Sequence, residues 1–461
     1  MSRYLPVFLQ RPWRAEILAT ITLGLPLISA QLAQMAINMT NTLVLGRLGP
    51  DELAASVLGW QLFFVVWILG TGFGFAVMPL VAGAASSQDA RGIARFVHMG
   101  LWVSLAYTVL MAWPLSNAEP IFLALGQEAS ISQLAAEYVR VLQWSMFPQL
   151  AIIVLRSFLG GVQRPTIVVI ALAGGAVVNL VLNVTLVFGV AGLVPALGMR
   201  GAAWATVLAT TCVALFLFWF AARHRSVRKH RLGRRILQPD RPALNDIFRL
   251  GWPIGITLVA EVGLFTATSV MMGWLGAHEL AAHGIAVQLS GVAFMVPLGL
   301  SAASTIRTGW ARGRDDRDGV ACAALSAIFI GLGFAGFSAM AFLLLPAWLV
   351  GLYLDLHDTG ARQVLSIAIG YLAVAAAFQL FDALQALANG ALRGLKDTRI
   401  PMVLALVSYW LLGVPTSYVL GFILDWGGIG VWWGQATGLG AAAILLGMRL
   451  VRQIRAMPRT A

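Results

Sequence analysis

Two carboxylates, Glu261 and Asp382, lie deep inside long apolar segments of this chain. The remaining acidic residues fall at or near the interruptions between segments, with Glu137 beside Arg140 as the borderline case. An ionisable side chain inside a bilayer is costly, and it usually serves function with an oppositely charged partner. Burial disfavours the charged form of a carboxylate, so a proton, a sodium ion or an organic cation could neutralise either side chain. We therefore expect Glu261 and Asp382 to couple to cations, including Na⁺ as a bound metal ion.

Uncharged polar side chains also recur inside the apolar segments. Residues three, four or seven apart share one face of a helix, so many of these side chains form stripes. Lipid cannot satisfy such groups, so they should face the interior of a helix bundle or a wet cavity. The amide side chains that we expect to bind substrate are Gln34, Asn38, Asn41, Asn179, Asn183, Gln288, Gln379 and Gln385. Alternatively, these amides only hold helices together through interhelical hydrogen bonds.

The elements that must position these residues are membrane-spanning helices. Hydrophobic residues make up 59% and charged residues 11% of the 461 residues, which is outside the range of soluble globular proteins. A spanning helix needs about 20 mostly apolar residues. Twelve segments qualify, at roughly 15–45, 53–82, 96–115, 134–155, 166–190, 201–222, 250–272, 280–305, 320–349, 363–391, 401–423 and 428–448. The predicted fold class is an all-α integral membrane protein with twelve transmembrane helices.

Basic residues are distributed unevenly between the two ends of these segments. The termini and alternate connections hold 27 of the 31 lysines and arginines, and the opposite connections hold only Arg47, Arg140, Arg200 and Arg362. The positive-inside rule then places both termini in the cytoplasm. This distribution explains the net charge of +12 without a nucleic-acid partner. No cleavable signal sequence is expected, because the first apolar segment is long and begins after Arg14.

Residue types that hold cofactors are scarce. Cys212 and Cys322 both lie in apolar segments, where a free cysteine behaves as a small hydrophobic residue. The six histidines show no metal-ligand spacing. We expect no resident cofactor, no disulfide and no catalytic residue.

The two halves of the sequence repeat one template. Residues 46–62 (GRLGPDELAASVLGWQL) align without gaps to residues 273–289 (GWLGAHELAAHGIAVQL), with nine of seventeen positions identical. We call this alignment, extended without gaps in both directions, the repeat register. Each half has an even number of spans, so an axis along the membrane normal relates them, as in transporters that bind substrate between two rocking bundles. The predicted domains are two pseudo-symmetric six-helix bundles, 1–222 and 250–461, joined by a basic cytoplasmic linker, 223–249.

Four stretches carry a resemblance to a known family. They are LGWPIGITLVAEVGLF at 250–265, LGAHELAAHGIAVQLSGVAFMVPLG at 275–299, LRSF at 155–158 and ALRGLKDTRIP at 391–401. With them, the chain resembles the bacterial NorM-like branch of the multidrug and toxic compound extrusion (MATE) family over almost its whole length. The resemblance implies an antiporter that expels lipophilic cationic drugs and dyes in exchange for Na⁺ or H⁺. It also implies that Phe265 and Phe294 contact the drug, and that Glu261 and Asp382 couple the ion.

The resemblance further implies a monomer in the lipid of the bacterial inner membrane. One residue departs from the family pattern, because relatives usually carry an aspartate late in the first span where this chain has Asn41. A neutral amide cannot exchange a proton. We therefore expect ion coupling to be concentrated in the second half of the chain.

Other functions fit the sequence less well. A major facilitator transporter also has two six-helix bundles, but residues 83–96 (GAASSQDARGIARF) lack its usual basic signature. A flippase for lipid-linked oligosaccharides, from the same broader superfamily, would favour basic residues in its cavity, and we expect none in the central spans. An intramembrane hydrolase with paired carboxylates would need a metal or nucleophile motif, which is not evident. The prediction is therefore a transporter and not an enzyme.

Overall fold

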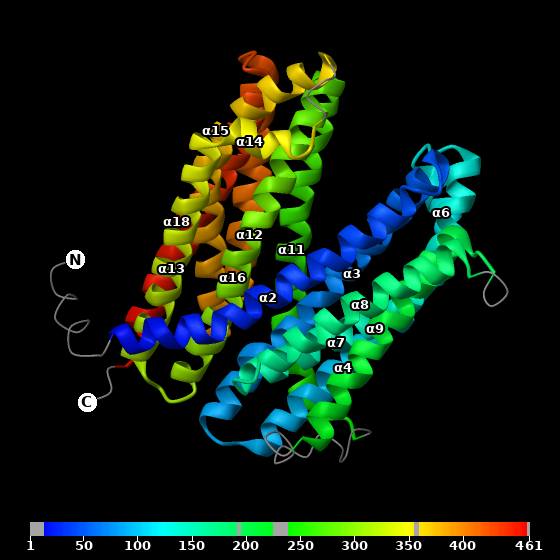
Figure 1. Cartoon of the computed structure of the whole chain (residues 1–461). Helices are drawn as coiled ribbons and strands as arrows, with labels where there is room; N and C mark the ends of the chain where they lie inside the picture. The colour runs from blue at the N-terminus through cyan, green and yellow to red at the C-terminus, as the bar shows by residue number, and fades with distance from the viewer. Residues whose placement is uncertain (1–12, 191–194, 225–237, 355–358, 459–461) are drawn as a thin grey trace. The chain divides into compact units, whose positions relative to one another are not determined.

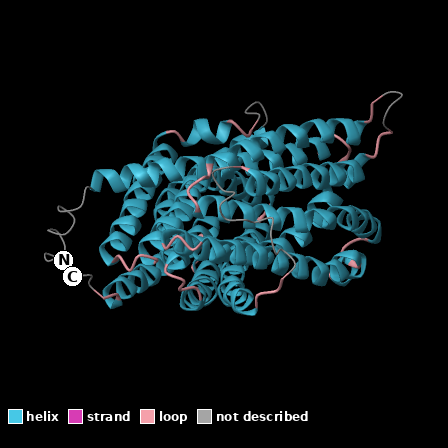
Figure 2. Cartoon of the chain, turned by 90° about the horizontal axis from the view of Figure 1, so that it is seen from below, coloured by secondary structure: helices cyan, strands magenta, loops and turns pink. Residues whose placement is uncertain are grey.

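The computed structural model describes residues 13–190, 195–224, 238–354 and 359–458 of the chain. Within these ranges the regular secondary structure is helical throughout (Figure 2). Twelve of the helical stretches are long and apolar enough to cross a bilayer. The predicted fold class, all-α with twelve membrane spans, is thereby confirmed.

The first six spans come from the N-terminal half of the chain (Figure 1). They are α2 (Trp13–Leu45), α3 (Pro50–Ser86), α4 (Ala90–Ser116), the pair α6 (Ala129–Leu142) and α7 (Met146–Gly161), α8 (Thr166–Phe188) and α9 (Gly198–Arg223). A 3₁₀ turn, η1 (Gln143–Ser145), joins α6 to α7 within one span. The short helix α5 (Ala118–Ala124) connects α4 to α6.

The last six spans follow the same plan. They are α11 (Arg241–Leu275), α12 (Ala277–Arg312), α13 (Arg317–Leu344), α15 (Thr359–Gly394), a composite span from Arg399 to Ile423, and α18 (Gly427–Ala456). The short helix α14 (Pro346–Gly351) follows α13. The composite span consists of α16 (Arg399–Leu406), η2 (Val407–Gly413), α17 (Val414–Tyr418) and η3 (Val419–Ile423), of which η2 and η3 are π-helical.

Local signals explain where several spans begin. Asp89 and Asp316 cap α4 and α13 by accepting hydrogen bonds from the backbone N–H three residues ahead, at 2.9 and 2.8 Å. The turn before α3 has Gly49 at φ 156°, and the turn before α12 has Gly276 at φ 137°. A side chain would strain the backbone at either angle. The repeat register pairs these two glycines, so both halves use the same turn.

The chain forms two compact units. The C-terminal unit contains the described residues of Met1–Ile28 and Ile256–Ala461, and the N-terminal unit contains those of Ser29–Gly255. The boundaries fall inside α2 and α11, so each of these helices begins in one unit and ends in the other. The middle of the predicted linker, residues 225–237, lies outside the described residues, and α11 already begins at Arg241.

Inside the C-terminal unit, the first part of α2 packs closely against the last part of α12. A Cβ atom added at Gly299 would lie 2.7 Å from the backbone N and Cα of Ile28. Farther along the same pair of helices, Arg307 donates from Nε and Nη2 to the two carboxylate oxygens of Glu16, at 2.9 and 2.5 Å. Two helix backbones approach this closely only where one helix lacks a side chain.

Inside the N-terminal unit, the first part of α11 packs against α3 in the same manner. A Cβ atom added at Gly72 would overlap the backbone of both Gly251 and Gly255, and one at Gly251 would lie 2.8 Å from the Cα of Phe73. The repeat register pairs Gly72 with Gly299 and Gly24 with Gly251. A Cβ at Gly24, in contrast, would meet only the side-chain end of Leu300.

Asp240 fixes the beginning of α11 to α4 within the N-terminal unit. Its Oδ1 accepts a hydrogen bond of 3.1 Å from the backbone N–H of Ala243 and one of 2.9 Å from Arg95 Nη2. The neighbouring Arg95 guanidinium holds the pKa of the Asp240 carboxyl below its usual value.

Candidate functional site

The two predicted cation-coupling acids come together in the C-terminal unit. Glu261 projects from α11 and Asp382 from α15, and the side chain of Gln385, one turn after Asp382, lies between them. Gln385 Nε2 donates to Glu261 Oε1 at 3.2 Å and to Asp382 Oδ1 at 3.4 Å. Asp382 is 3% exposed and Gln385 is 1% exposed. Three of the predicted site residues therefore form one hydrogen-bonded cluster, which we call the acidic cluster.

A fourth residue of the acidic cluster, Tyr409, was not predicted. It lies on η2, is fully buried, and donates from its hydroxyl to Gln385 Oε1 at 3.0 Å. This bond directs the carbonyl oxygen of Gln385 to Tyr409 and the NH₂ group to the two acids. The next residue, Trp410, donates from Nε1 to the carbonyl of Ala260 at 3.2 Å. A π-helical turn often marks a functional position, and here it presents two consecutive ring side chains to neighbouring helices.

The expectation that the central spans contain no basic residue is corrected by the structure. Arg156, which we placed on a connection, belongs to α7 and is only 7% exposed. Arg393 lies in the last turn of α15, half-buried, and its positive charge interacts with Glu261. Both side chains start near the ends of their spans but extend into protein, because long basic side chains can bury their stems. The absence of interior cations therefore cannot be used against a flippase.

The other predicted residues of the C-terminal unit are not hydrogen-bonded to the acidic cluster. Phe265, one turn after Glu261, makes an edge-on contact with Phe378 at a centroid distance of 6.0 Å. Gln379 is buried and donates to the carbonyl of Ser290 at 3.1 Å, which is the helix-joining role considered for these amides. Two further candidates, Gln288 and Phe294, lie half-buried on α12.

The N-terminal unit brings three predicted amides together without an acid. Asn41 Oδ1 accepts from Asn183 Nδ2 at 2.8 Å, and Asn41 Nδ2 donates to Thr206 Oγ1 at 3.2 Å. Asn183 also donates to Asn179 Oδ1 at 3.1 Å. Asn179 and Asn183 are fully buried on α8. These four residues form what we call the amide cluster, in which Thr206 of α9 is the member that was not predicted.

The amide cluster is not fully satisfied. Asn179 Nδ2 and Asn183 Oδ1 are buried, and neither has a hydrogen-bond partner among the described residues. Such orphaned groups are costly unless water or a ligand meets them. The remaining N-terminal candidate, Gln34, lies half-buried on α2, at the position that the repeat register pairs with Glu261. The borderline acid Glu137 pairs with Arg200 at 2.8 Å, and both side chains are partly exposed.

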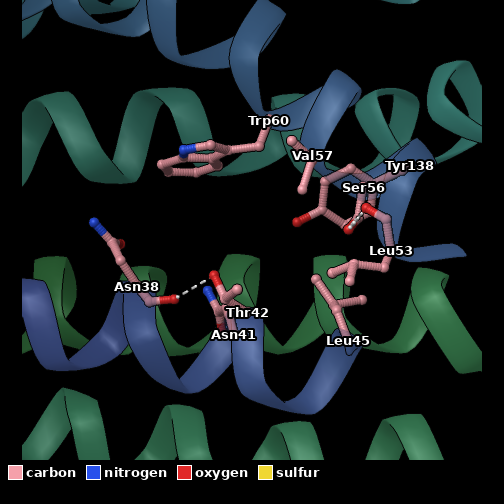
Figure 3. Close-up of a pocket in the computed structure, with 9 residues that line it drawn as sticks. All are labelled: Asn38, Asn41, Thr42, Leu45, Leu53, Ser56, Val57, Trp60 and Tyr138. Atoms are coloured by element: carbon pink, nitrogen blue, oxygen red, sulfur yellow. Dashed lines mark hydrogen bonds between the residues drawn. The ribbon is translucent and has the colours of Figure 1, made fainter. Parts of the chain in front are cut away.

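A small pocket opens beside the amide cluster (Figure 3). Its volume is about 90 Å³, and its lining comes from the end of α2, the beginning of α3 and one residue of α6. Trp60 and Val57 lie on one side, and Asn38, Asn41 and Thr42 lie on the other. The full lining is Asn38, Asn41, Thr42, Leu45, Leu53, Ser56, Val57, Trp60 and Tyr138. No lining residue carries a charge.

The two clusters differ in what they can bind. The acidic cluster offers two carboxylates within reach of one amide, and hard cations such as Na⁺ prefer oxygen ligands of this kind. The described residues contain no group of three or more His, Cys, Asp or Glu placed to hold a metal ion, so such a cation would depend on amide or hydroxyl oxygens as well. The amide cluster and its pocket offer hydrogen bonds and ring surfaces only.

Twelve membrane spans and a pair of carboxylates inside one unit are typical of a multi-pass membrane transporter. The MatE family model matches the chain at residues 26–185 and again at 253–419, and the repeat register pairs the two starting residues, Pro26 and Pro253. The chain belongs to the MatE family. Its members are transporters, so the chain is a transporter and not an enzyme.

Relatives of nearly equal length lie in the NorM branch. The chain is 44% identical over 443 residues to a probable multidrug resistance protein NorM of Rhizobium meliloti, covering 96% of this chain and 95% of that protein. It is 41% identical over 449 residues to the NorM protein of Agrobacterium fabrum, covering 97% and 96%. The predicted family and branch are confirmed.

Solved structures agree with the fold. A MATE transporter crystallised with the compound MaL6 superposes with a TM-score of 0.87 at 23% identity, covering 96% of this chain and 98% of the other. The eukaryotic MATE transporter AtDTX14 gives a TM-score of 0.86 at 19% identity, covering 96% and 98%. At this level of identity the likeness concerns the fold alone.

Proposed function

We propose that this protein exports lipophilic organic cations across the bacterial inner membrane in exchange for Na⁺ or H⁺. The observation that carries the proposal is the acidic cluster, in which Gln385 holds Glu261 and Asp382 together inside the C-terminal unit. The NorM relatives, named as probable multidrug resistance proteins, support drugs as the cargo. No resident cofactor is needed for this exchange.

Competition for the two acids supplies the coupling. Desolvated carboxylates favour any cation that neutralises them, so an inorganic cation and an organic one exclude each other. An ion entering from outside displaces the drug, and the emptied cluster captures a new organic cation when it faces the cytosol. Exchange of this kind requires alternating access, for which paired six-helix bundles are suited.

We also propose that both termini are cytoplasmic and that the protein works as a monomer in membrane lipid. The orientation is supported by the 27 of 31 basic residues that lie at the termini, on one set of connections or at the span ends next to them. A cysteine placed in the segment 225–237 should react with a membrane-impermeant thiol reagent only in everted vesicles. Labelling in intact cells would contradict the orientation.

Transport in everted vesicles tests the proposed function. A fluorescent organic cation should leave the medium and enter the vesicles when a Na⁺ gradient or a pH gradient is imposed, and the gradient that drives uptake identifies the coupling ion. Vesicles without the protein are the control. Uptake that ignores both gradients, or that persists unchanged in the double variant Glu261→Gln/Asp382→Asn, would overturn the proposal.

The flippase alternative receives no specific support. Arg156 and Arg393 remove one objection to an anionic lipid carrier. However, the charge of Arg393 interacts with Glu261, and the two carboxylates remain joined in one cluster. Transport of a lipid-linked oligosaccharide in reconstituted vesicles, with no cation uptake, would be its signature.

A further inference from the structure

Three large aromatic side chains follow one face of α3. Trp60, Phe64 and Trp67 are spaced four and three residues apart, which places them on the same side of the helix. Their rings contact in series, with centroid distances of 6.0 Å between the first two and 5.7 Å between the last two. All three residues are half-buried, so each retains an accessible portion. We call these three residues the aromatic track.

The aromatic track begins at the uncharged pocket. Trp60 lines this pocket opposite Asn38 and Asn41 (Figure 3). Pockets that enclose a whole drug-sized ligand usually measure about 300–1,000 Å³. A cavity of about 90 Å³ is far smaller, so it can hold only part of such a ligand. The rest of the ligand must extend beyond the pocket, and the rings of the track continue from it along α3.

At the other end of the track, Trp67 has an unmet hydrogen-bond donor. Its Nε1 is buried and has no acceptor among the described residues. An indole N–H that is buried usually finds an acceptor. The unmet donor belongs to the last ring of the track, so this end of the track still needs an acceptor from water or from a bound molecule.

The second half of the chain does not reproduce this feature. The repeat register pairs Trp60, Phe64 and Trp67 with Val287, Gly291 and Phe294, so only one ring remains there. A general need for rings in this part of the fold would have produced similar residues in both halves. The track is therefore particular to the N-terminal unit.

We propose that the aromatic track and its pocket bind the planar aromatic ring system of an exported drug. This proposal rests on the proposed function and names the chemistry of one of its substrate sites. Stacking on indole and phenyl faces supplies the attraction, and it needs neither a carboxylate nor a coupling ion. The pocket lining is uncharged, so no side chain in it competes for Na⁺ or H⁺. This agrees with drug binding by stacking, separate from ion binding at the acidic cluster.

Direct binding to the purified protein in nanodiscs tests the proposal. The affinity for ethidium, a planar aromatic cation, is measured by fluorescence anisotropy. The affinity for tetraethylammonium, a cation without a ring, is measured by displacement of the radiolabelled compound. Trp60→Ala and Trp67→Ala should each weaken ethidium binding about tenfold, which corresponds to about 1.4 kcal/mol. Binding of tetraethylammonium should not change. Trp60→Phe retains a ring and should bind ethidium within about threefold of the wild type.

Trp219→Ala is the matched control. Trp219 contacts Phe216 at 6.1 Å on α9 of the same unit, is 57% exposed, and does not line the pocket. It should bind ethidium as the wild type does. Unchanged ethidium affinity in both track variants, or equal weakening of both cations, would overturn the proposal.

The outcome also separates the track from the proposed function. If the wild-type protein binds ethidium through the track but moves no cation under either gradient, the proposed function fails and the track stands. If it exports ethidium and the track variants bind it normally, only the track fails.

Discussion

The two units are built from one repeat but hold opposite kinds of interior chemistry. The repeat register pairs Gln34 with Glu261 and Asn41 with Thr268. The C-terminal unit has an acidic cluster bridged by one amide, whereas the N-terminal unit has an amide cluster beside a neutral pocket. The scaffold is therefore symmetric while its charge is not. The comparison teaches that two copies of one helical plan can share the order of their spans and turns and still differ in interior charge.

The difference in charge has a functional consequence. Amides hydrogen-bond to one another in the same way at any pH, whereas two neighbouring carboxylates inside the unit, one buried and one half-buried, need a cation to balance them. We expect the acidic cluster to determine how efflux depends on Na⁺ or H⁺, and the aromatic track to determine which aromatic drugs bind. Two of the following four experiments test this division, and the other two test the packing and one ion pair within the units.

The largest effect is expected from the acids. Glu261→Gln and Asp382→Asn keep the shape of the side chains but remove the charge that organic and inorganic cations share. Each should lower the initial rate of ion-driven efflux by roughly tenfold or more, equivalent to at least about 1.4 kcal/mol. The rate is measured as the uptake of a fluorescent cation into everted vesicles. Ser366→Ala, an exposed position on the same helix, is the control. Efflux at the wild-type rate in both acid variants would refute the division.

A structural comparison comes next. Gly251→Ala would drive its Cβ against the backbone of Phe73, whereas Gly24→Ala at the matching position meets only the end of the Leu300 side chain. Overpacking of this kind costs about 1–3 kcal/mol. Gly251→Ala should lower the thermal unfolding temperature in detergent clearly more than Gly24→Ala. Equal shifts would mean that the two helix crossings are equally tight.

Restoring an acid to the N-terminal unit should have a smaller effect. Asn41→Asp would place a carboxylate beside Asn183, which can donate to it, and beside Thr206, whose hydroxyl could donate only by leaving the carbonyl of Ala202. Efflux at neutral pH should change by less than about fivefold, or about 1 kcal/mol, but its dependence on pH or Na⁺ should change in shape. Asn41→Ala removes the amide without adding charge and serves as control. If efflux by Asn41→Asp depends on pH and Na⁺ as the wild type does, a carboxylate at this position takes no part in ion coupling.

The smallest effect is expected at the Arg95–Asp240 pair. Because Arg95 lowers the pKa of Asp240 in the folded protein, the pair stabilises the fold above the unfolded-state pKa and loses this contribution as pH falls through the lower folded-state value. Its side chains are 49% and 25% exposed, so the contribution is at most about 1 kcal/mol. Asp240→Asn keeps the side-chain oxygen that caps α11. Its thermal unfolding temperature in detergent at pH 7 should lie slightly below that of the wild type. A difference that persists below the folded-state pKa would point to another cause.

Much of the fold could be predicted because its signals are local. Twelve apolar segments, a glycine turn repeated at Gly49 and Gly276, and two interior acids can all be recognised in the sequence. The joining of Gln385 to Asp382 also follows from helical spacing, since three residues make almost one turn.

The remaining features depend on contacts between distant residues. Tyr409 resembles any aromatic residue of an apolar span, and only the π-helical turn of η2 directs it to Gln385. Arg393 follows an apolar segment and looks like a cytoplasmic anchor, although its charge interacts with Glu261. The sharing of α2 and α11 between units has no local signal either, because the glycines that permit it are common in membrane helices.

The crossing of α2 with α12 has a consequence for biogenesis. During translation, Ile28 leaves the ribosome long before Gly299 exists, so the first part of α2 must wait in the membrane for its neighbour. The matching segment of α11 finds α3 already synthesised. A ribosome stalled once Gly255 has left its exit tunnel would therefore carry a nearly complete N-terminal unit, and the first part of α2 would still lack its packing partner α12.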